Sequence, residues 1–395
     1  MNIASRTTIY AVTLGCLLFP VTGMSATLEE IDQRLKKLES DVSISREETD
    51  DLDSRFRNNM SVTGYADVEY ITTNENGKDD GFRIHHLSMF LKKQISEKWR
   101  FFSEIEYEDG PFYEPSKASN VSTASVPAAS GVPDATTVGS GKIFAEAVNF
   151  DFQWRPDTSL RAGRFFTPAG LWSVDHYPPF VATQERPQHI RLIFPQLVDG
   201  AAISGNHPIG KAFVNYDLYI GNGETTRFDG AKDSNSTKAA GLRFAVSLPI
   251  AQQFELGATL YRDKLASAAD ANKPEKDARG FHAKVRLGGF GYQAEYADGS
   301  YKPTVLPGNN LPYHRKGFYN QISYDVSSWT LGYRYDYYDP STIKSNDVKR
   351  FNSVFANYHV SKNIVLKLEH HLVDQEDPTK QDYYKNLASI AVNLD

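Results

Sequence analysis

From about residue 60 to the end of the chain, apolar and polar side chains alternate with a period of two. The alternation is visible in residues 62–70 and recurs in segments 144–152, 281–287 and 364–369. A period of two places successive side chains on opposite faces of a β-strand, so each segment predicts a strand with one apolar and one polar face. We count sixteen such segments, and an even number of strands is typical of bacterial membrane barrels.

The connections between these segments alternate in length. Seven are short turns, at Ser96–Glu97, Pro156–Asp157, Asn206–Pro208, Pro249–Ile250, Gly288–Gly289, Ser327–Ser328 and Ser361–Lys362. Eight are longer polar stretches, at residues 73–80, 109–141, 168–196, 222–237, 264–276, 299–313, 340–346 and 375–382. Short turns at one rim and long loops at the other are typical of a membrane barrel, whereas a soluble sandwich does not sort its loops by length. The pattern predicts an all-β fold, a 16-stranded antiparallel transmembrane β-barrel over residues 59–395 that begins and ends on the periplasmic side.

Aromatic residues follow the same division. Trp99, Trp154 and Trp329 fall beside short turns. Tyrosines fall near the long loops, at Tyr70, Tyr107, Tyr261, Tyr296, Tyr337 and Tyr384. Membrane barrels place such aromatic girdles at their two water interfaces, which supports the barrel interpretation.

The N-terminal residues have the anatomy of a secretory signal. Arg6 precedes an apolar run from Ile9 to Phe19, and the small residue Ala26 follows at a suitable cleavage position. We therefore predict a cleaved signal peptide over residues 1–26. The only cysteine, Cys16, lies inside the apolar run; the alternative of lipid attachment there is disfavoured because Thr13 stands where a leucine is normally found.

The next segment has a helical period. Apolar or small residues recur at spacings of three and four, at Leu28, Ile31, Leu35, Leu38, Val42, Ser45, Thr49, Leu52 and Phe56. This rhythm predicts an α-helical coiled coil over residues 27–58, which self-associates through its narrow apolar stripe. Ser45 and Thr49 weaken the middle of the stripe, and a lone charged helix is the alternative.

Composition and charge narrow the classes of function. Mean hydropathy is −0.47 and 23% of residues are charged, yet aromatic residues reach 12%, a combination that suits a barrel with a polar lumen and an apolar exterior. The net charge of −6 and the lack of a basic stripe argue against a nucleic-acid partner.

Four stretches, taken in order, resemble the porin O and P family, the phosphate-selective porins and their relatives. They are the segment from Gly81 to Asp109, LRAGRFFTPAGL (Leu160–Leu171), LVDGAAISG (Leu197–Gly205) and YDLYIGNGE (Tyr216–Glu224). The resemblance covers residues 60–250 well and the remainder only by strand rhythm. It implies a sixteen-stranded homotrimer in the outer membrane of a Gram-negative bacterium, with an inward third loop that narrows each pore. It also implies passive uptake of small, often anionic solutes of the phosphate or carboxylate type, with no cofactor.

The chain departs from the phosphate-selective members in two ways. Those members carry ladders of basic residues in the lumen, whereas here the inward positions also carry acids, at Asp67, Glu69, Glu104, Glu106, Glu255, Glu295, Asp336 and Glu369. The basic residues expected in the lumen are Arg243, Lys284, Arg286, Arg334 and Lys367. The chain also ends in Leu394 and Asp395 without the terminal aromatic common in such barrels. A mixed lumen argues against strong phosphate selectivity.

The third loop is the candidate pore constriction. Its charged residues and those beside it are Arg164, Arg186, His189, Arg191, Asp175 and Glu185. If the loop folds into the pore, its arginines attract carboxylates or phosphates where the channel is narrowest. The alternative is that these arginines pair with acids and hold the loop in place.

Other chemistry is not indicated by the motifs. Adjacent residues on a strand point to opposite faces, so neither His85–His86 nor His370–His371 chelates a metal by itself, and we expect no metal site. There is no Gly-x-Ser-x-Gly motif, and we expect no enzyme activity. The alternative function is a surface adhesin or receptor barrel whose long loops bind partners.

Overall fold

The computed structural model describes residues 60–394 except 79, 109–112, 115–136, 139–141, 225–236, 265–274 and 303–311, together with residues 32, 36, 37, 39 and 42. The chain divides into two units, Met1–Asn58 and Asn59–Asp395. The predicted signal peptide and, apart from those five positions, the predicted coiled coil lie outside the described residues. Among the described residues, no helix is long and apolar enough to cross a membrane.

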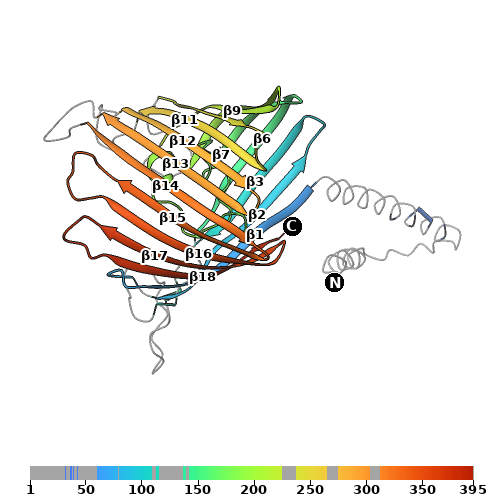
Figure 1. Ribbon diagram of the computed structural model, residues 1–395. Helices are drawn as coiled ribbons and strands as arrows, with labels where there is room; N and C mark the ends of the chain where they lie inside the picture. The colour runs from blue at the N-terminus through green and yellow to red at the C-terminus, as the bar shows by residue number, and fades with distance from the viewer. Residues whose placement is uncertain are drawn as a thin grey trace, which may run out of the picture. The chain divides into compact units, whose positions relative to one another are not determined.

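In the described part of the chain, sixteen antiparallel strands form one closed barrel (Figure 1). They are β1 (Met60–Thr73), β2 (Gly81–Gln94), β3 (Trp99–Glu108), β6 (Lys142–Arg155), β7 (Thr158–Phe166), β8 (Leu197–Ile209), β9 (Ala212–Gly221), β10 (Ala239–Ser247), β11 (Gln253–Lys264), β12 (Glu275–Leu287), β13 (Phe290–Lys302), β14 (Tyr313–Val326), β15 (Trp329–Asp339), β16 (Lys349–Ser361), β17 (Ile364–Gln375) and β18 (Tyr383–Asn393). Each strand pairs with its neighbours in the chain, and β1 closes the ring by pairing with β18. The predicted sixteen-stranded antiparallel barrel is confirmed.

Within the described part of residues 60–394, two short strands and one short helix lie outside the wall. Strands β4 (Tyr113–Glu114) and β5 (Thr137–Val138) pair with each other in the second long loop. Helix α3 (Ile190–Ile193) is a single turn near the end of the third loop.

The wall is polar inside and apolar outside, the reverse of a soluble protein. On β17, Lys367 and Glu369 are almost completely buried, whereas Leu366 and Leu368 on the opposite face are exposed. Closure removes every sheet edge, so all backbone groups of the wall pair with each other and the outer face can contact hydrocarbon. The apolar positions of the alternating pattern therefore face lipid, and the polar positions face the lumen.

One predicted turn is wrong. Asn206–Pro208 lies within β8, which continues to Ile209 and pairs with β9. The chain reverses at Gly210, whose φ of 63° is a left-handed conformation that glycine adopts without steric cost. Pro208 suggested a turn, but near the end of a strand a proline removes only one ladder hydrogen bond.

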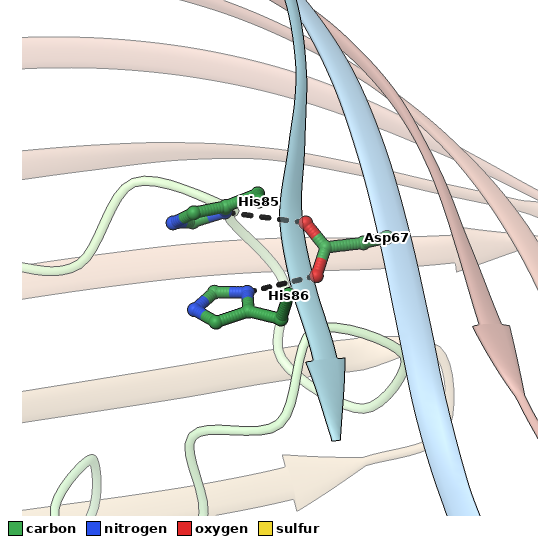
Figure 2. A group of neighbouring side chains, drawn as sticks. All are labelled: Asp67, His85 and His86. Atoms are coloured by element: carbon green, nitrogen blue, oxygen red, sulfur yellow. Dashed lines mark hydrogen bonds and ion pairs between the residues drawn. The ribbon is translucent and has the colours of Figure 1, made fainter. Parts of the chain in front are cut away.

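A β-bulge breaks the alternation on β2. The register between β1 and β2 shifts at Asp67/Val68, where Asp67 lies opposite His86 and Val68 lies opposite Ile84. The extra residue, His85, therefore keeps the same face as His86, and both rings point toward Asp67 (Figure 2). The expectation that His85 and His86 face opposite sides is wrong for this physical reason.

The second histidine pair follows ordinary alternation. His371 is buried in the lumen beside Glu369 and Ser353, whereas His370 is only half-buried and contacts Asn386. The two pairs have the same sequence spacing, so only the register of the sheet distinguishes them.

The outer face provides a first prediction. Phe281 lies in the middle of β12 and Leu287 at its short-turn end, and both are exposed on the same face. Phe281→Arg should lower the free energy of unfolding in lipid vesicles by about 2–4 kcal/mol, because arginine is costly at the bilayer midplane. The matched variant Leu287→Arg should cost only about 0–1 kcal/mol, since the interface solvates the guanidinium. Equal costs in urea titrations would contradict this depth assignment.

Candidate functional site

The third loop, residues 167–196, connects β7 to β8 and is bonded to the inner surface of the barrel. Its backbone and side chains contact inward-facing groups from strands on opposite sides of the wall, including Thr259 on β11 and Lys367 on β17. A loop bonded to both sides of the ring crosses the lumen. This segment is therefore the feature around which the candidate site is built.

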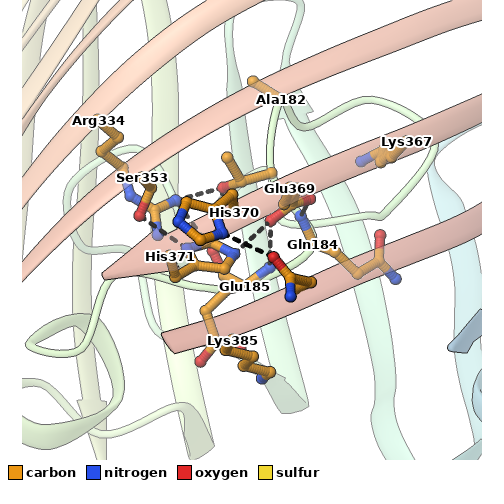
Figure 3. A network of polar contacts seen from close by, with 12 residues as sticks. Ala182, Gln184, Glu185, Arg334, Ser353, Lys367, Glu369, His370, His371 and Lys385 are labelled. Atoms are coloured by element: carbon orange, nitrogen blue, oxygen red, sulfur yellow. Dashed lines mark hydrogen bonds and ion pairs between the residues drawn. The ribbon is translucent and has the colours of Figure 1, made fainter. Parts of the chain in front are cut away.

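Three buried basic residues of the wall donate hydrogen bonds to the loop backbone. The Arg243 Nε donates to the Gly170 carbonyl at 2.9 Å, and the Lys367 Nζ donates to the Val181 carbonyl at 2.7 Å. The Arg334 guanidinium donates to the Glu185 carbonyl at 2.9 Å and to the Thr183 hydroxyl (Figure 3). Each of these cations is less than a tenth exposed, so it acts as a brace between the wall and the loop.

Buried carboxylates of the wall accept hydrogen bonds from amide groups of the loop. Glu295 on β13 accepts the Trp172 amide at 3.0 Å, and Glu146 on β6 accepts the Gln196 side-chain amide at 3.1 Å. Glu369 on β17 accepts the Gln184 amide and also contacts His371 (Figure 3). A buried polar group that loses its hydrogen-bond partner is costly, so these contacts fix the loop against the wall.

Apolar contacts and one glycine of the wall allow the C-terminal end of the loop to pack closely against the barrel. Ile193 and Phe194 pack into the main buried apolar cluster, beside Phe165, Val198 and residues of β8 to β13. A Cβ at Gly317 would lie only 2.2 Å from the Cβ of His189. The absence of a side chain there lets the loop approach the wall of β14.

Of the predicted constriction set, His189 is buried, whereas Glu185 is partly exposed and lines a cavity of the lumen. Burial acts to raise the pKa of Glu185, but the charge of Lys385 and of further cations lowers it to about 2, and Glu185 forms an ion pair with Lys385. Burial lowers the pKa of His189 to about 3, and the charge of Arg334 adds to the shift. Glu185 therefore stays ionised and His189 stays neutral at physiological pH.

Two further members, Asp175 and Arg186, line cavities and are accessible to a solute. Asp175 lines a cavity of about 650 Å³ in the lumen, and Arg186 lines a second cavity of about 310 Å³. The side chain of Arg191 lies outside the described part of the chain. Residues 175, 185, 186 and 189 thus all belong to the loop that crosses the lumen, but they lie on different surfaces of that loop.

Arg164 does not belong to the constriction, and its assignment there is wrong. It lies on the outward face of β7 with Leu160, opposite Val148 of β6. Its guanidinium forms a two-pronged ion pair with Asp199 of β8, at 2.6 and 2.8 Å. The error arose because proximity in sequence to the loop says nothing about which face of the strand a residue occupies.

The predicted basic lumen residues divide into two groups. Arg243, Arg334 and Lys367 are the braces described above. Lys284 and Arg286 of β12 instead line the larger cavity. Arg286 forms an ion pair with Asp325, whereas Lys284 has no ion pair or hydrogen bond to the described residues.

One cavity lies on each side of the loop. The short-turn cavity is about 650 Å³ and is lined by Trp172, Lys284, Gln293 and Ser328, among others. The long-loop cavity is about 310 Å³ and is lined by Arg83, His85, Gln184 and Arg186, among others. Their linings carry charges of both signs, so each offers polar contacts without a strong net field.

The sequence interpretation missed several residues that complete the site. Glu146 belongs to a cluster with Glu104 and Glu106, with carboxylate oxygens within 4.8 Å of one another. A bulge opposite Glu104 and Ile105 turns Glu146 inward, which period-two counting does not reveal. Lys385 was recoverable, because it occupies a polar position in an alternating segment.

His189 makes the site's stability depend on pH. In the unfolded chain a histidine titrates near 6.5, whereas folded His189 takes up a proton only near pH 3. Between these values the unfolded state binds more protons, so the contribution of His189 to stability falls as pH falls from about 6.5 to 3. Both ring nitrogens lack a hydrogen-bond partner among the described residues.

We expect His189→Leu to gain stability relative to the wild type by about 3 kcal/mol between pH 7 and pH 4, since each pKa unit corresponds to about 1.4 kcal/mol. Urea unfolding in detergent at both pH values measures the difference. The half-buried His370→Leu serves as control and should change much less. The same pH dependence in His189→Leu and the wild type would contradict a neutral, buried His189.

Comparison with known proteins agrees with this architecture. The family described as Gram-negative porin matches residues 200–378. A search among curated proteins gave no significant match.

Solved structures share the fold at low sequence identity. An anion-selective porin from Comamonas acidovorans has a TM-score of 0.60 at 12% identity, covering 85% of this chain and 99% of that one. The trimer form of OmpT, an outer membrane protein of Vibrio cholerae, has a TM-score of 0.55 at 11% identity, covering 85% and 99%. The outer membrane channel DcaP of Acinetobacter baumannii has a TM-score of 0.53 at 11% identity, covering 85% and 97%. At these identities the likeness shows the fold alone.

The barrel, its apolar exterior and the family match together place this chain in the outer membrane of a Gram-negative bacterium, as predicted.

Proposed function

We propose that the protein is a porin, a channel rather than an enzyme, through which small hydrophilic solutes cross the outer membrane by passive diffusion. The observation that carries the proposal is the polar lumen of a closed barrel, crossed by a braced loop with a cavity on each side. Such an interior suits water and polar solutes, and bracing maintains a fixed narrowing. The similarity to porin folds supports the same function.

We further propose a weak preference for anions, including phosphates and carboxylates. Arg186 lines the long-loop cavity, and Lys284, which has no ion-pair partner among the described residues, lines the short-turn cavity. Arg243, Arg334 and Lys367 donate to the loop backbone, and Arg286 pairs with Asp325. Both cavity linings also carry acids, which favours weak selectivity over strict phosphate specificity.

Planar bilayer recording tests both parts of the proposal. The purified protein should give a steady open conductance, and a potassium chloride gradient should reveal anion preference. Arg186→Ala should lower the chloride-to-potassium permeability ratio by up to about sevenfold, because a unit charge about 7 Å away in water favours chloride and disfavours potassium by about 0.6 kcal/mol each.

The matched control is Arg164→Ala, which removes an equal charge from the outward face and should leave the permeability ratio unchanged. A protein without steady conductance would instead favour the adhesin or receptor function. Cation preference in the wild type, or an unchanged ratio in Arg186→Ala, would contradict the selectivity proposal alone.

We propose that the protein acts as a homotrimer. Support comes from the apolar stripe predicted between Leu28 and Phe56, and from the trimer form of a protein with the same fold. The Arg164–Asp199 pair adds support, because an outward-facing ion pair is better accommodated against protein than in hydrocarbon. Light scattering in mild detergent should give three chains per particle; a monomer with and without residues 27–58 would contradict the proposal.

A further inference from the structure

A cluster of two histidines and one carboxylate lies in the barrel wall, beside the third loop. Asp67 of β1 contacts His85 and His86 of β2, and we call these three residues the His–His–Asp cluster (Figure 2). The Nδ1 of His86 lies 2.8 Å from Asp67 Oδ1, and the Nδ1 of His85 lies 3.2 Å from Asp67 Oδ2. No part of the proposed channel function requires this arrangement.

We propose that the cluster binds a divalent transition-metal cation of the zinc class. Imidazole nitrogen and carboxylate oxygen are the ligands that such ions prefer, with bonds of about 2.0–2.2 Å. Two donors at that distance from one ion lie about 2.9–3.5 Å apart at angles of about 90–110°. The observed nitrogen–oxygen separations are close to this range, so an ion needs only small side-chain movements to enter.

The bulge at His85–His86 is the structural cause of the cluster. On a regular strand one ring would face lipid, as the alternation on β17 shows for His370 and His371. A bulge costs one ladder position and re-aims a side chain, and bulges occur often beside functional sites. Here the bulge directs a second imidazole, that of His85, to the carboxylate of Asp67.

Gln184 of the third loop supplies a second, independent observation. Its Nε2 contacts Asp67 Oδ2 and lies 3.2 Å from His85 Nδ1, while its Oε1 is buried without a hydrogen-bond partner. The oxygen and nitrogen of an amide differ only by a rotation of the group. With the amide turned over, Oε1 points at the cluster as a fourth oxygen donor, and an ion there satisfies the oxygen that is otherwise left unpaired.

The surroundings supply further carboxylates and access to the lumen, although Glu69 also pairs with Arg83. Carboxylates of Glu69 and Glu108 lie 3.6 Å from His85 Nδ1 and 3.9 Å from His86 Nε2, respectively. His85 also lines the long-loop cavity, so an ion reaches the cluster from the solvent-filled lumen. The bound ion would link β1 and β2 to the third loop through Gln184.

Zinc binding to the full-length, tag-free protein in detergent tests the inference. Equilibrium dialysis against zinc chloride should give one zinc per chain, and cobalt(II) in its place should show the visible absorption of a nitrogen- and oxygen-ligated ion. Asp67→Asn, which keeps the shape of the side chain, and His85→Ala, which lies beside the cavity, should each weaken zinc binding at least about tenfold.

His370→Ala removes a histidine from the other adjacent pair and should bind zinc like the wild type. Heat-dependent mobility on electrophoresis verifies that each variant is folded. A wild type that binds no zinc, or zinc binding that Asp67→Asn and His85→Ala leave unchanged, would overturn the inference. If the Glu104–Glu106–Glu146 carboxylates bind the zinc instead, Asp67→Asn and His85→Ala will leave zinc binding unchanged. The readout is independent of conductance, so it stands apart from the test of channel function.

Discussion

Closure of the hydrogen-bonded wall leaves each strand residue only two directions, toward lipid or toward the lumen, and the interior depends on this constraint. Backbone groups cannot remain unpaired in hydrocarbon, so the wall must be continuous and its outer face apolar. The polar half of every strand is thereby directed inward. A ring of sixteen such strands gathers more charged side chains than a small lumen can hydrate, and these charges require partners.

The third loop provides many of those partners through its backbone. Arg243, Arg334 and Lys367 donate to loop carbonyls, while Glu295 and Glu369 accept loop amides. Removing one partner of a buried charge typically costs about 3–5 kcal/mol, so neither the loop nor the wall keeps its arrangement without the other. The basic residues that would otherwise attract anions in an open pore are used to position the loop. Arg186 and Lys284, by contrast, line the two cavities of the lumen.

Departures from regular pairing add chemistry that a regular barrel lacks. The bulge on β2 directs His85 and His86 to one carboxylate, and the bulge on β6 turns Glu146 toward Glu104 and Glu106. Both lie on strands that face the third loop from the same side of the ring. The two bulges therefore add an imidazole and a carboxylate to the inner surface of this part of the wall.

The sequence by itself determined the strand count, the alternation of short turns and long loops, and the faces of most strands. These follow from local periodicity, because a period of two sorts side chains between lipid and lumen wherever pairing is regular. The outward position of Arg164 also follows from regular alternation with Leu160. The sequence did not determine the shared face of His85 and His86 or the inward turn of Glu146. Each of these depends on register between neighbouring strands, which a single bulge reverses. The loop partners of Arg334, Lys367 and Glu369 lie more than 140 residues away in sequence, so only the tertiary structure decided which charges brace the loop and which face the pore.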